Sequence, residues 1–279
     1  MLNLGLSTAF FEADTPLETA ARRTRDLGLE TLALVVPGPV PGRPRDAVRS
    51  VGVTVGGVVL GEAGATDDAF ERHRAAAVAA AARLRAPSVV VEGGDLGLKA
   101  SRTLKRAESA LLAAFRGGEA PDVAEAQALR DAEREGGADR AARALHRASA
   151  DGAELAIRNG GRAADLLLQP DVVEWLLSDL PTLGLWFDPA RAHRAWCLGL
   201  GPEPAAWADR FAGRTTGVFV HGLGSDLGGH GHPEDGAPDW GTLGRSLPHR
   251  VPWILDVTHT LSAADVEDAI RYLRAMVGE

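Results

Sequence analysis

Short runs of apolar residues recur along the chain, and five of them end directly before a polar side chain. The runs span residues 89–91, 155–157, 185–187, 217–220 and 253–255, and the residues that follow them are Glu92, Arg158, Asp188, His221 and Asp256. The runs are continuous rather than alternating, which is typical of parallel strands that are covered on both faces. We therefore expect strands that each deliver a polar side chain to the same side of a parallel sheet.

The same interpretation of the whole chain gives eight strands that alternate with helices. Strands are predicted at residues 2–7, 31–36, 51–60, 88–91, 154–157, 182–187, 217–220 and 253–255, helices at 16–27, 45–50, 67–85, 101–115, 138–150, 170–178, 203–211, 240–246 and 263–277, and a proline-rich loop at 37–44. Eight such units in 279 residues predict an α/β fold, a (β/α)8 TIM barrel in one domain. A doubly wound open sheet is the alternative, but neither GxGxxG after the first strand nor GxxxxGK[ST] occurs.

Residues 93–151 are the least regular part of the chain. The helix at 101–115 is followed by Gly117-Gly118, by a charged, alanine-rich stretch at 119–135, and by the helix at 138–150. Two helices where one would suffice predict a helical insertion after the fourth strand, at about residues 100–150. The insertion is either a surface elaboration or a lid or dimer contact near the end of that strand.

Composition narrows the classes of function. The net charge of −8 and the aromatic content of 5% disfavour a nucleic-acid partner, which calls for basic groups and stacking rings. The single cysteine, Cys197, excludes a disulfide framework and a cysteine-based zinc site. Neither a run of about 18 apolar residues nor a signal-peptide pattern occurs, so we expect a cytoplasmic protein without a membrane partner. A homo-oligomer is left open.

A glycine-rich segment follows the seventh predicted strand and carries further candidate groups. It places His230, His232 and Asp235 between His221 and the helix that begins at residue 240. A buried strand that ends on histidine and leads into a long loop lets several polar groups converge. In a barrel these groups would lie at the C-terminal mouth, where the active sites of such folds are built.

Several stretches of the second half carry a recognisable order of motifs. They are LAIRNGGR (155–162), LGLWFDPARAH (183–193), VFVHGLGSD (218–226), HPEDGAPDW (232–240) and WILD (253–256), and LGLSTAF forms the opening strand. Together they resemble the xylose-isomerase-like TIM barrels, which are sugar isomerases and epimerases with endonuclease IV as a distant relative. The resemblance implies a divalent metal ion, Mn²⁺, Co²⁺, Zn²⁺ or Mg²⁺, for which Asp188, His221 and Asp256 stand at three ligand positions. It also implies catalytic acids that move a proton, for which Asp256 and Glu92 are the candidates.

The chain departs from this family at the ligand expected on the fifth strand. Arg158 replaces the expected glutamate, while the asparagine that follows it is kept as Asn159. A guanidinium can neither bind a metal ion nor act as a base. We therefore expect a metal-poor site in which Arg158 pairs with Asp188 or Asp256, or binds an anionic substrate. The alternative is a metal that remains bound, with a water molecule or Glu92 completing its ligands.

Three histidines complete the candidate substrate site, together with Arg158 and Asn159. His193 lies near the position of a family histidine that follows the sixth strand. His230 and His232 resemble the Asp-x-His of endonuclease IV, and the alternative is that both are solvated loop residues.

The resemblance implies an enzyme of the sugar isomerase or epimerase type that acts on a small polar or anionic, carbohydrate-type molecule. A non-catalytic, metal-free barrel that binds a sugar-like ligand or a protein partner is the first alternative. An endonuclease IV-like phosphodiesterase is the second, and the acidic net charge and the missing ligands weigh against it.

Overall fold

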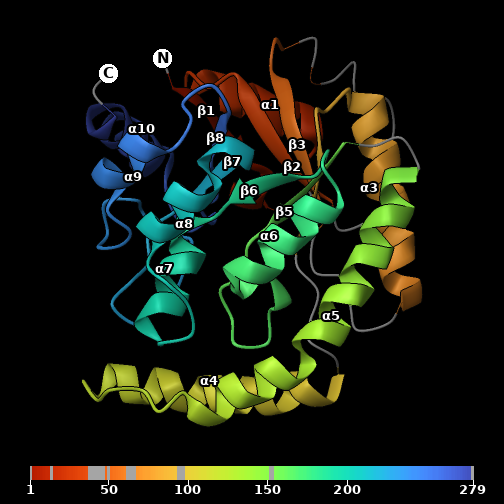
Figure 1. The fold of residues 1–279 in the computed structure, drawn as a ribbon. Coiled ribbons are helices and arrows are strands. Elements are labelled where there is room, and N and C mark those ends of the chain that lie inside the picture. The colour runs from red at the N-terminus through yellow and green to blue at the C-terminus, as the bar shows by residue number, and fades with distance from the viewer. Residues whose placement is uncertain are drawn as a thin grey trace.

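The eight strands form a closed parallel barrel in sequence order, as predicted (Figure 1). The computed structural model describes residues 2–12, 15–36, 48, 51–60, 67–92, 98–150 and 154–277. The strands are β1 (Asn3–Ser7), β2 (Thr31–Val36), β3 (Thr54–Leu60), β4 (Val89–Glu92), β5 (Leu155–Arg158), β6 (Gly184–Phe187), β7 (Thr215–Val220) and β8 (Pro252–Leu255). The barrel closes where β1 pairs with β8, with Gly5 beside Ile254, and this closure rules out the open sheet.

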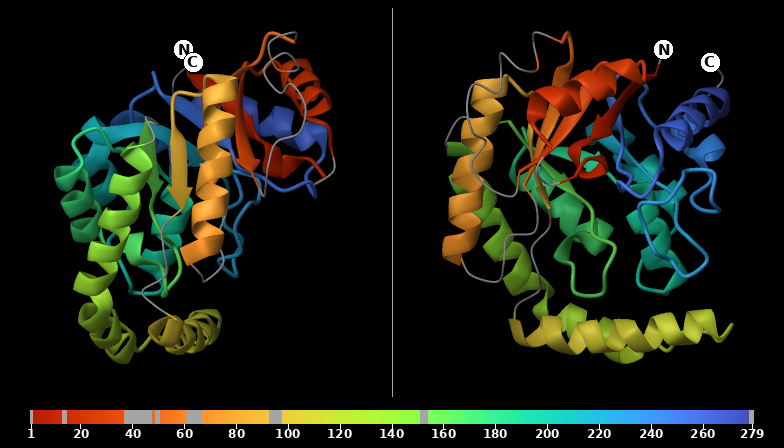
Figure 2. Two further views of the ribbon diagram at one scale, coloured as in Figure 1. Left: turned by 90° about the vertical axis from the view of Figure 1, so that its right-hand side faces the viewer. Right: turned by 180° about the vertical axis from the view of Figure 1, so that it is seen from behind.

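Helices surround the barrel and return the chain from one strand to the next (Figures 1 and 2). They are α1 (Leu17–Asp26), α3 (Asp67–Leu84), α4 (Leu98–Arg116), α5 (Ala124–Ala150), α6 (Pro170–Asp179), α7 (Pro189–Cys197), α8 (Pro204–Phe211), α9 (Trp240–Ser246) and α10 (Ala263–Met276). The predicted loop at 37–44 lies outside the described residues, as does the helix at 45–50 except for Val48. None of the described helices is long and apolar enough to cross a membrane.

Local signals explain where several helices begin and end. Ser262 begins α10 with a capping box that it forms with Asp265. Gly28 lies just after α1 at a φ of 73°, a left-handed conformation that glycine adopts without steric cost. Helix α7 was not predicted, although Asp188 and Pro189 provide its N-cap and its first residue.

The insertion after β4 consists of two helices, and its second helix differs from the prediction. Helix α5 is continuous over 27 residues and runs through Gly136 and Gly137, whereas the sequence indicated a helix from residue 138 only. Each glycine lowers helix stability by about 1 kcal/mol. Burial of Ala126, Ala142 and Leu145 on the inner face offsets that cost. Helix α4 lies across one end of the barrel, outside the ring of the other helices (Figures 1 and 2).

The barrel interior is a small apolar cluster that is separate from the core between strands and helices. It consists of Ala33, Val59, Val90, Ala156, Trp186, Phe219 and Ile254. Trp186 is fully buried, and its ring lies against the backbones of Gly57 on β3 and Gly217 on the neighbouring β7. A single large ring therefore fills space that two glycines leave open.

This arrangement predicts that Gly217→Ala destabilises the protein by about 1–3 kcal/mol through overpacking. An ideal Cβ at residue 217 would lie 2.4 Å from the Trp186 ring. Gly213→Ala is the matched control, because no atom beyond its two chain neighbours lies within 4 Å of its Cβ position. Urea unfolding followed by tryptophan fluorescence measures both variants, and equal midpoints would contradict the close contact.

Candidate active site

The barrel brings the five polar strand-end residues together at one mouth. Glu92 and Arg158 are the last residues of β4 and β5 and lie side by side in register. Asp188, His221 and Asp256 directly follow β6, β7 and β8. Because all strands of a parallel barrel end on the same side, five positions far apart in sequence converge there. These five residues are called the Arg158 cluster below.

Arg158 is the centre of this cluster and contacts all three of its carboxylates. Its Nη1 donates to Glu92 Oε1 at 2.7 Å, and its Nε donates to Asp188 Oδ2 at 2.9 Å. Its Nη2 donates to Asp188 Oδ2 at 2.5 Å and to Asp256 Oδ2 at 2.7 Å. The prediction of a partner for Arg158 named Asp188 or Asp256, and the structure shows both, with Glu92 in addition.

Below the guanidinium lies the barrel interior. The Arg158 Cζ atom is 3.7 Å from the ring centroid of Phe219, close enough for a cation–π interaction. Burial by itself lowers the pKa of Arg158, but the charges of Asp188, Asp256 and Glu92 outweigh burial and raise it. Arg158 is 3% exposed and is therefore a buried, permanently charged group.

Asp188 is fully buried and links the cluster to the elements around it. Its backbone N–H donates to Asn159 Oδ1 at 2.6 Å, and its carbonyl accepts from Asn159 Nδ2 at 2.9 Å. Its carboxylate also caps α7 by accepting from the Arg191 backbone N–H at 2.9 Å. Burial raises the pKa of Asp188, but Arg158 and then His221 lower it well below its usual value, so this carboxylate stays charged.

Two histidine rings stack beside the carboxylates, His221 on His230, with centroids 4.6 Å apart. The His230 backbone N–H donates to His221 Nδ1 at 3.0 Å, so His221 Nε2 carries the proton that faces Asp188 at 3.3 Å. His230 Nδ1 donates to the Asp256 carbonyl at 2.7 Å, so in the neutral ring Nε2 is the hydrogen-bond acceptor. These contacts hold His230 at a φ of 68°, which non-glycine residues rarely adopt.

The two other predicted histidines lie outside the Arg158 cluster. His193 packs edge-on against Trp196 in α7, with ring centroids 5.2 Å apart. His232 lies beside α10, with its Nε2 3.8 Å from Asp268 Oδ2. A role for either residue in substrate binding stays a prediction.

Three arginines that were not predicted as site residues line a pocket of about 260 Å³ next to the cluster. They are Arg162, Arg191 and Arg194, and His221 and His230 line the same pocket. Arg191 also joins the cluster, because its Nη2 donates to Glu92 Oε1 at 3.0 Å and its Nε lies 3.4 Å from Asp188 Oδ2. The only sequence signal for Arg191 was its place three residues after Asp188.

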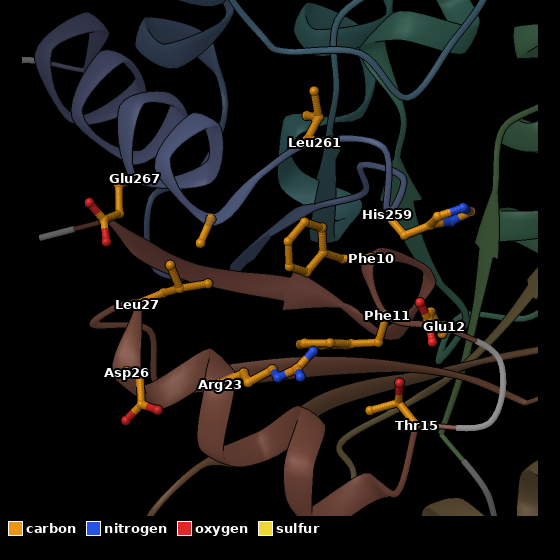
Figure 3. Close-up of a pocket in the computed structure, with 11 residues that line it drawn as sticks. Phe10, Phe11, Glu12, Thr15, Arg23, Asp26, Leu27, His259, Leu261 and Glu267 are labelled. Atoms are coloured by element: carbon orange, nitrogen blue, oxygen red, sulfur yellow. The ribbon is translucent and has the colours of Figure 1, made fainter.

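A second pocket, of about 560 Å³, lies between α1 and α10 (Figure 3). Phe10, Phe11 and Leu261 provide its apolar surface, and Arg23 and Glu267 are among the charged residues that line it. None of the predicted site residues lines this pocket, so the mouth of the barrel remains the candidate site.

Comparison with known proteins identifies the fold but no close relative. No family model and no curated protein matches the sequence. A protein from Rhodospirillum rubrum, provisionally described as a xylose isomerase, is 16% identical with a TM-score of 0.71, over 99% of both chains. D-psicose 3-epimerase from Clostridium cellulolyticum, solved with D-tagatose, is 10% identical with a TM-score of 0.68, over 99% of both chains. An AP endonuclease of family 2 from Brucella melitensis is 10% identical with a TM-score of 0.67, over 99% of both chains.

The chain has the xylose-isomerase-like TIM-barrel fold. Within that fold, the resemblance in sequence placed a divalent metal ion on Asp188, His221 and Asp256. The side chains do not fit such an ion, because the Arg158 guanidinium lies between Asp188 and Asp256. Its Nη2 donates to the Oδ2 atom of each of these carboxylates, which a metal ion would need as a ligand. A cation there would also face the charge of Arg158 at close range. Among the described residues, no group of three or more His, Cys, Asp or Glu side chains is arranged to hold a metal ion.

The geometry predicts that Arg158→Met destabilises this xylose-isomerase-like barrel by about 3–5 kcal/mol near neutral pH, because it leaves buried carboxylates without their cation. Arg22→Met, which breaks an exposed pair with Glu18, is the control and should change stability by less than about 1 kcal/mol. Urea unfolding at pH 7 tests this expectation, and equal effects of the two substitutions would contradict it.

The pH dependence of the same variant provides a separate prediction. In the wild type, the lowered pKa values of Asp188 and Asp256 contribute stability that is present above the unfolded value of about 3.9 and is lost as the pH falls below it. In Arg158→Met the buried acids gain from protonation instead. The stability deficit of the variant should therefore shrink as the pH falls from 7 towards 4, and a deficit that grows over this range would contradict the assigned pairs.

Proposed function

We propose that this protein binds a small polar, carbohydrate-type molecule at the C-terminal mouth of its barrel, and that it does so without a divalent metal ion. The observation that carries the proposal is the buried Arg158, paired with Glu92, Asp188 and Asp256 where a metal ion would otherwise neutralise the acids. The fold supports the class of ligand, because a sugar epimerase of this fold superposes over nearly its whole length.

The pocket beside the cluster suits a ligand with several hydroxyl groups. It offers guanidinium donors from Arg191 and Arg194, and the Nε2 acceptor of His230. Donors and acceptors that alternate around a small space can each take a hydroxyl group, which both donates and accepts. Arg158 in this proposal is a fixed internal cation that keeps Asp188 and Asp256 charged and holds all three carboxylates in position.

Isomerisation or epimerisation of such a sugar is the second candidate function, and His230 is the observation that favours it. The imidazole lines the pocket and is oriented by the Asp256 carbonyl, an arrangement that suits proton transfer to or from a bound molecule. The catalytic roles predicted for Asp256 and Glu92 stay predictions, and both carboxylates already accept from Arg158.

D-Tagatose, the sugar in the neighbouring epimerase structure, is a suitable first probe. We expect it to bind both the protein as purified and the protein treated with EDTA, with the same affinity and the same melting temperature. Calorimetry, thermal unfolding and elemental analysis of the purified protein provide the measurements. Loss of binding after EDTA, restored by Mn²⁺, would overturn metal independence.

Arg191→Ala should weaken binding by at least about tenfold, or about 1.4 kcal/mol, and unchanged affinity would remove the pocket from the proposal.

The identity of residue 158 provides a second test of metal independence. Arg158→Glu should raise the affinity for Mn²⁺ at least tenfold, about 1.4 kcal/mol, because it replaces a buried cation with a carboxylate ligand. Arg162→Glu makes the same change of charge at the pocket edge, where Arg162 pairs with Asp165 instead, and should not raise the affinity. Adding His221→Ala to Arg158→Glu should remove the gain. Equal Mn²⁺ affinity of wild type and Arg158→Glu in titration calorimetry would contradict the assignment.

A further inference from the structure

Two hydrogen-bond donors at the mouth converge on a single carboxylate, that of Glu108 in α4. Arg194 Nη2 lies 2.5 Å from Glu108 Oε1, and the Ala163 backbone N–H donates to Glu108 Oε2 at 2.9 Å. One donor comes from α7 and the other from the connection between β5 and α6. A guanidinium and a backbone N–H that hold the two oxygens of one group form an oxyanion-binding arrangement.

Both donors are held in place by groups other than Glu108. Arg194 Nη1 donates to the Gly161 carbonyl at 2.8 Å, which orients the guanidinium. Arg130 of α5, which is buried, donates to the Ala163 carbonyl and, at 3.1 Å, to the Asp165 carbonyl. The donors would therefore keep their positions if the carboxylate between them were exchanged for another.

The carboxylate itself comes from outside the barrel. Helix α4 lies across the mouth (Figure 1). Leu104, Glu108 and Leu111 are buried and share one face of this helix at spacings of four and three residues. Both leucines are buried, so Glu108 places a charge among buried residues of this face. A buried carboxylate is costly without a partner, so the face is built around the contact with Arg194 and Ala163.

We propose that Arg194 and the Ala163 N–H form an oxyanion subsite of the mouth pocket, which Glu108 fills while α4 lies across the mouth. A ligand that carries a carboxylate or phosphate group takes this subsite over and displaces Glu108. The inference rests on the proposed function, since Arg194 lines the same pocket, and it adds the chemical class of one ligand group. It also makes α4 the lid of this subsite.

The far end of α4 is attached in a way that permits this displacement. Arg116, the last residue of the helix, lies 3.5 Å from Asp226 Oδ2, and both side chains are exposed, so the pair adds little stability. Gly118 follows at a φ of 73°, where a glycine allows the chain to change direction. The proposal requires α4 to move about this end while α5 keeps its contacts with the barrel.

The first experiment replaces the carboxylate of Glu108, which competes with the ligand for the subsite, by the uncharged amide of glutamine, which has the same shape. Inorganic phosphate and acetate, titrated calorimetrically, should each bind Glu108→Gln at least tenfold more tightly than the wild type. Glu119→Gln changes an exposed carboxylate just beyond α4 and should match the wild type. Adding Arg194→Gln to Glu108→Gln should abolish the gain. Equal affinities of wild type and Glu108→Gln, or a gain that survives in the double variant, would overturn the subsite, and the tighter of the two anions identifies the oxyanion source.

A second experiment uses the unaltered protein, so it holds even where Glu108→Gln fails to fold. Saturating phosphate should speed hydrogen exchange at the backbone amides of α4 around residues 104–112 and leave α6 unchanged. Unchanged or slower exchange in α4 would overturn displacement of the lid. D-Tagatose binding separates the two proposals. If the protein does not bind D-tagatose but responds to phosphate as expected, only the proposed function is rejected. If it binds D-tagatose but does not respond to phosphate, only the subsite is rejected.

Discussion

A buried arginine that is shared by three carboxylates is the interaction on which the mouth of this barrel depends. Glu92, Asp188 and Asp256 come from strand ends that are far apart in sequence, and without a cation between them their charges would repel one another. Arg158 supplies that cation from the chain itself. Its flat guanidinium, stacked on Phe219, has several donors in one plane and can satisfy all three acids at once.

The cluster also determines the geometry of the elements around it. Asp188 contacts Arg158 through one carboxylate oxygen and caps α7 through the other, and the Asn159 side chain clamps its backbone. Helix α7 in turn presents Arg191 and Arg194 to the pocket. An internal cation, unlike a metal ion, cannot dissociate, so the position of these groups does not depend on the concentration of any ion.

Much of the fold could be predicted because it follows from local patterns. The continuous apolar runs gave all eight strands, since a strand that is buried on both faces leaves little choice of residue type. Two features could not be predicted in this way. Helix α5 runs through Gly136 and Gly137 because tertiary burial overrides intrinsic helix propensity. The start signals of α7, Asp188 and Pro189, lie in the motif at residues 183–193, where Asp188 was interpreted as a metal ligand.

The candidate site was predictable in position but not in its connections. Strand ends identified all five cluster residues, because topology alone brings them to one mouth. The contacts within the site depend on the length and direction of each side chain, which the sequence does not show. Arg158 contacts three acids rather than one, and His193 and His232 contact residues outside the cluster. The sequence does contain a signal for Glu108, because it is the one acid on the inward face of an amphipathic helix. Only the structure shows that this face lies over Arg194 and Ala163.

The cluster is distributed unequally over the two halves of the barrel. Glu92 at the end of β4 comes from the first half, whereas Arg158, Asp188, His221 and Asp256 all come from the second. The first three strands carry none of the five residues, so the charges of the cluster place no restriction on their sequence, whereas the packing of Gly57 against Trp186 does. In the second half, an exchange of Arg158, Asp188 or Asp256 leaves its partners with unbalanced charge, so change at these positions has to occur in compensated steps. A family descended from this chain should accordingly keep or replace Arg158, Asp188 and Asp256 together.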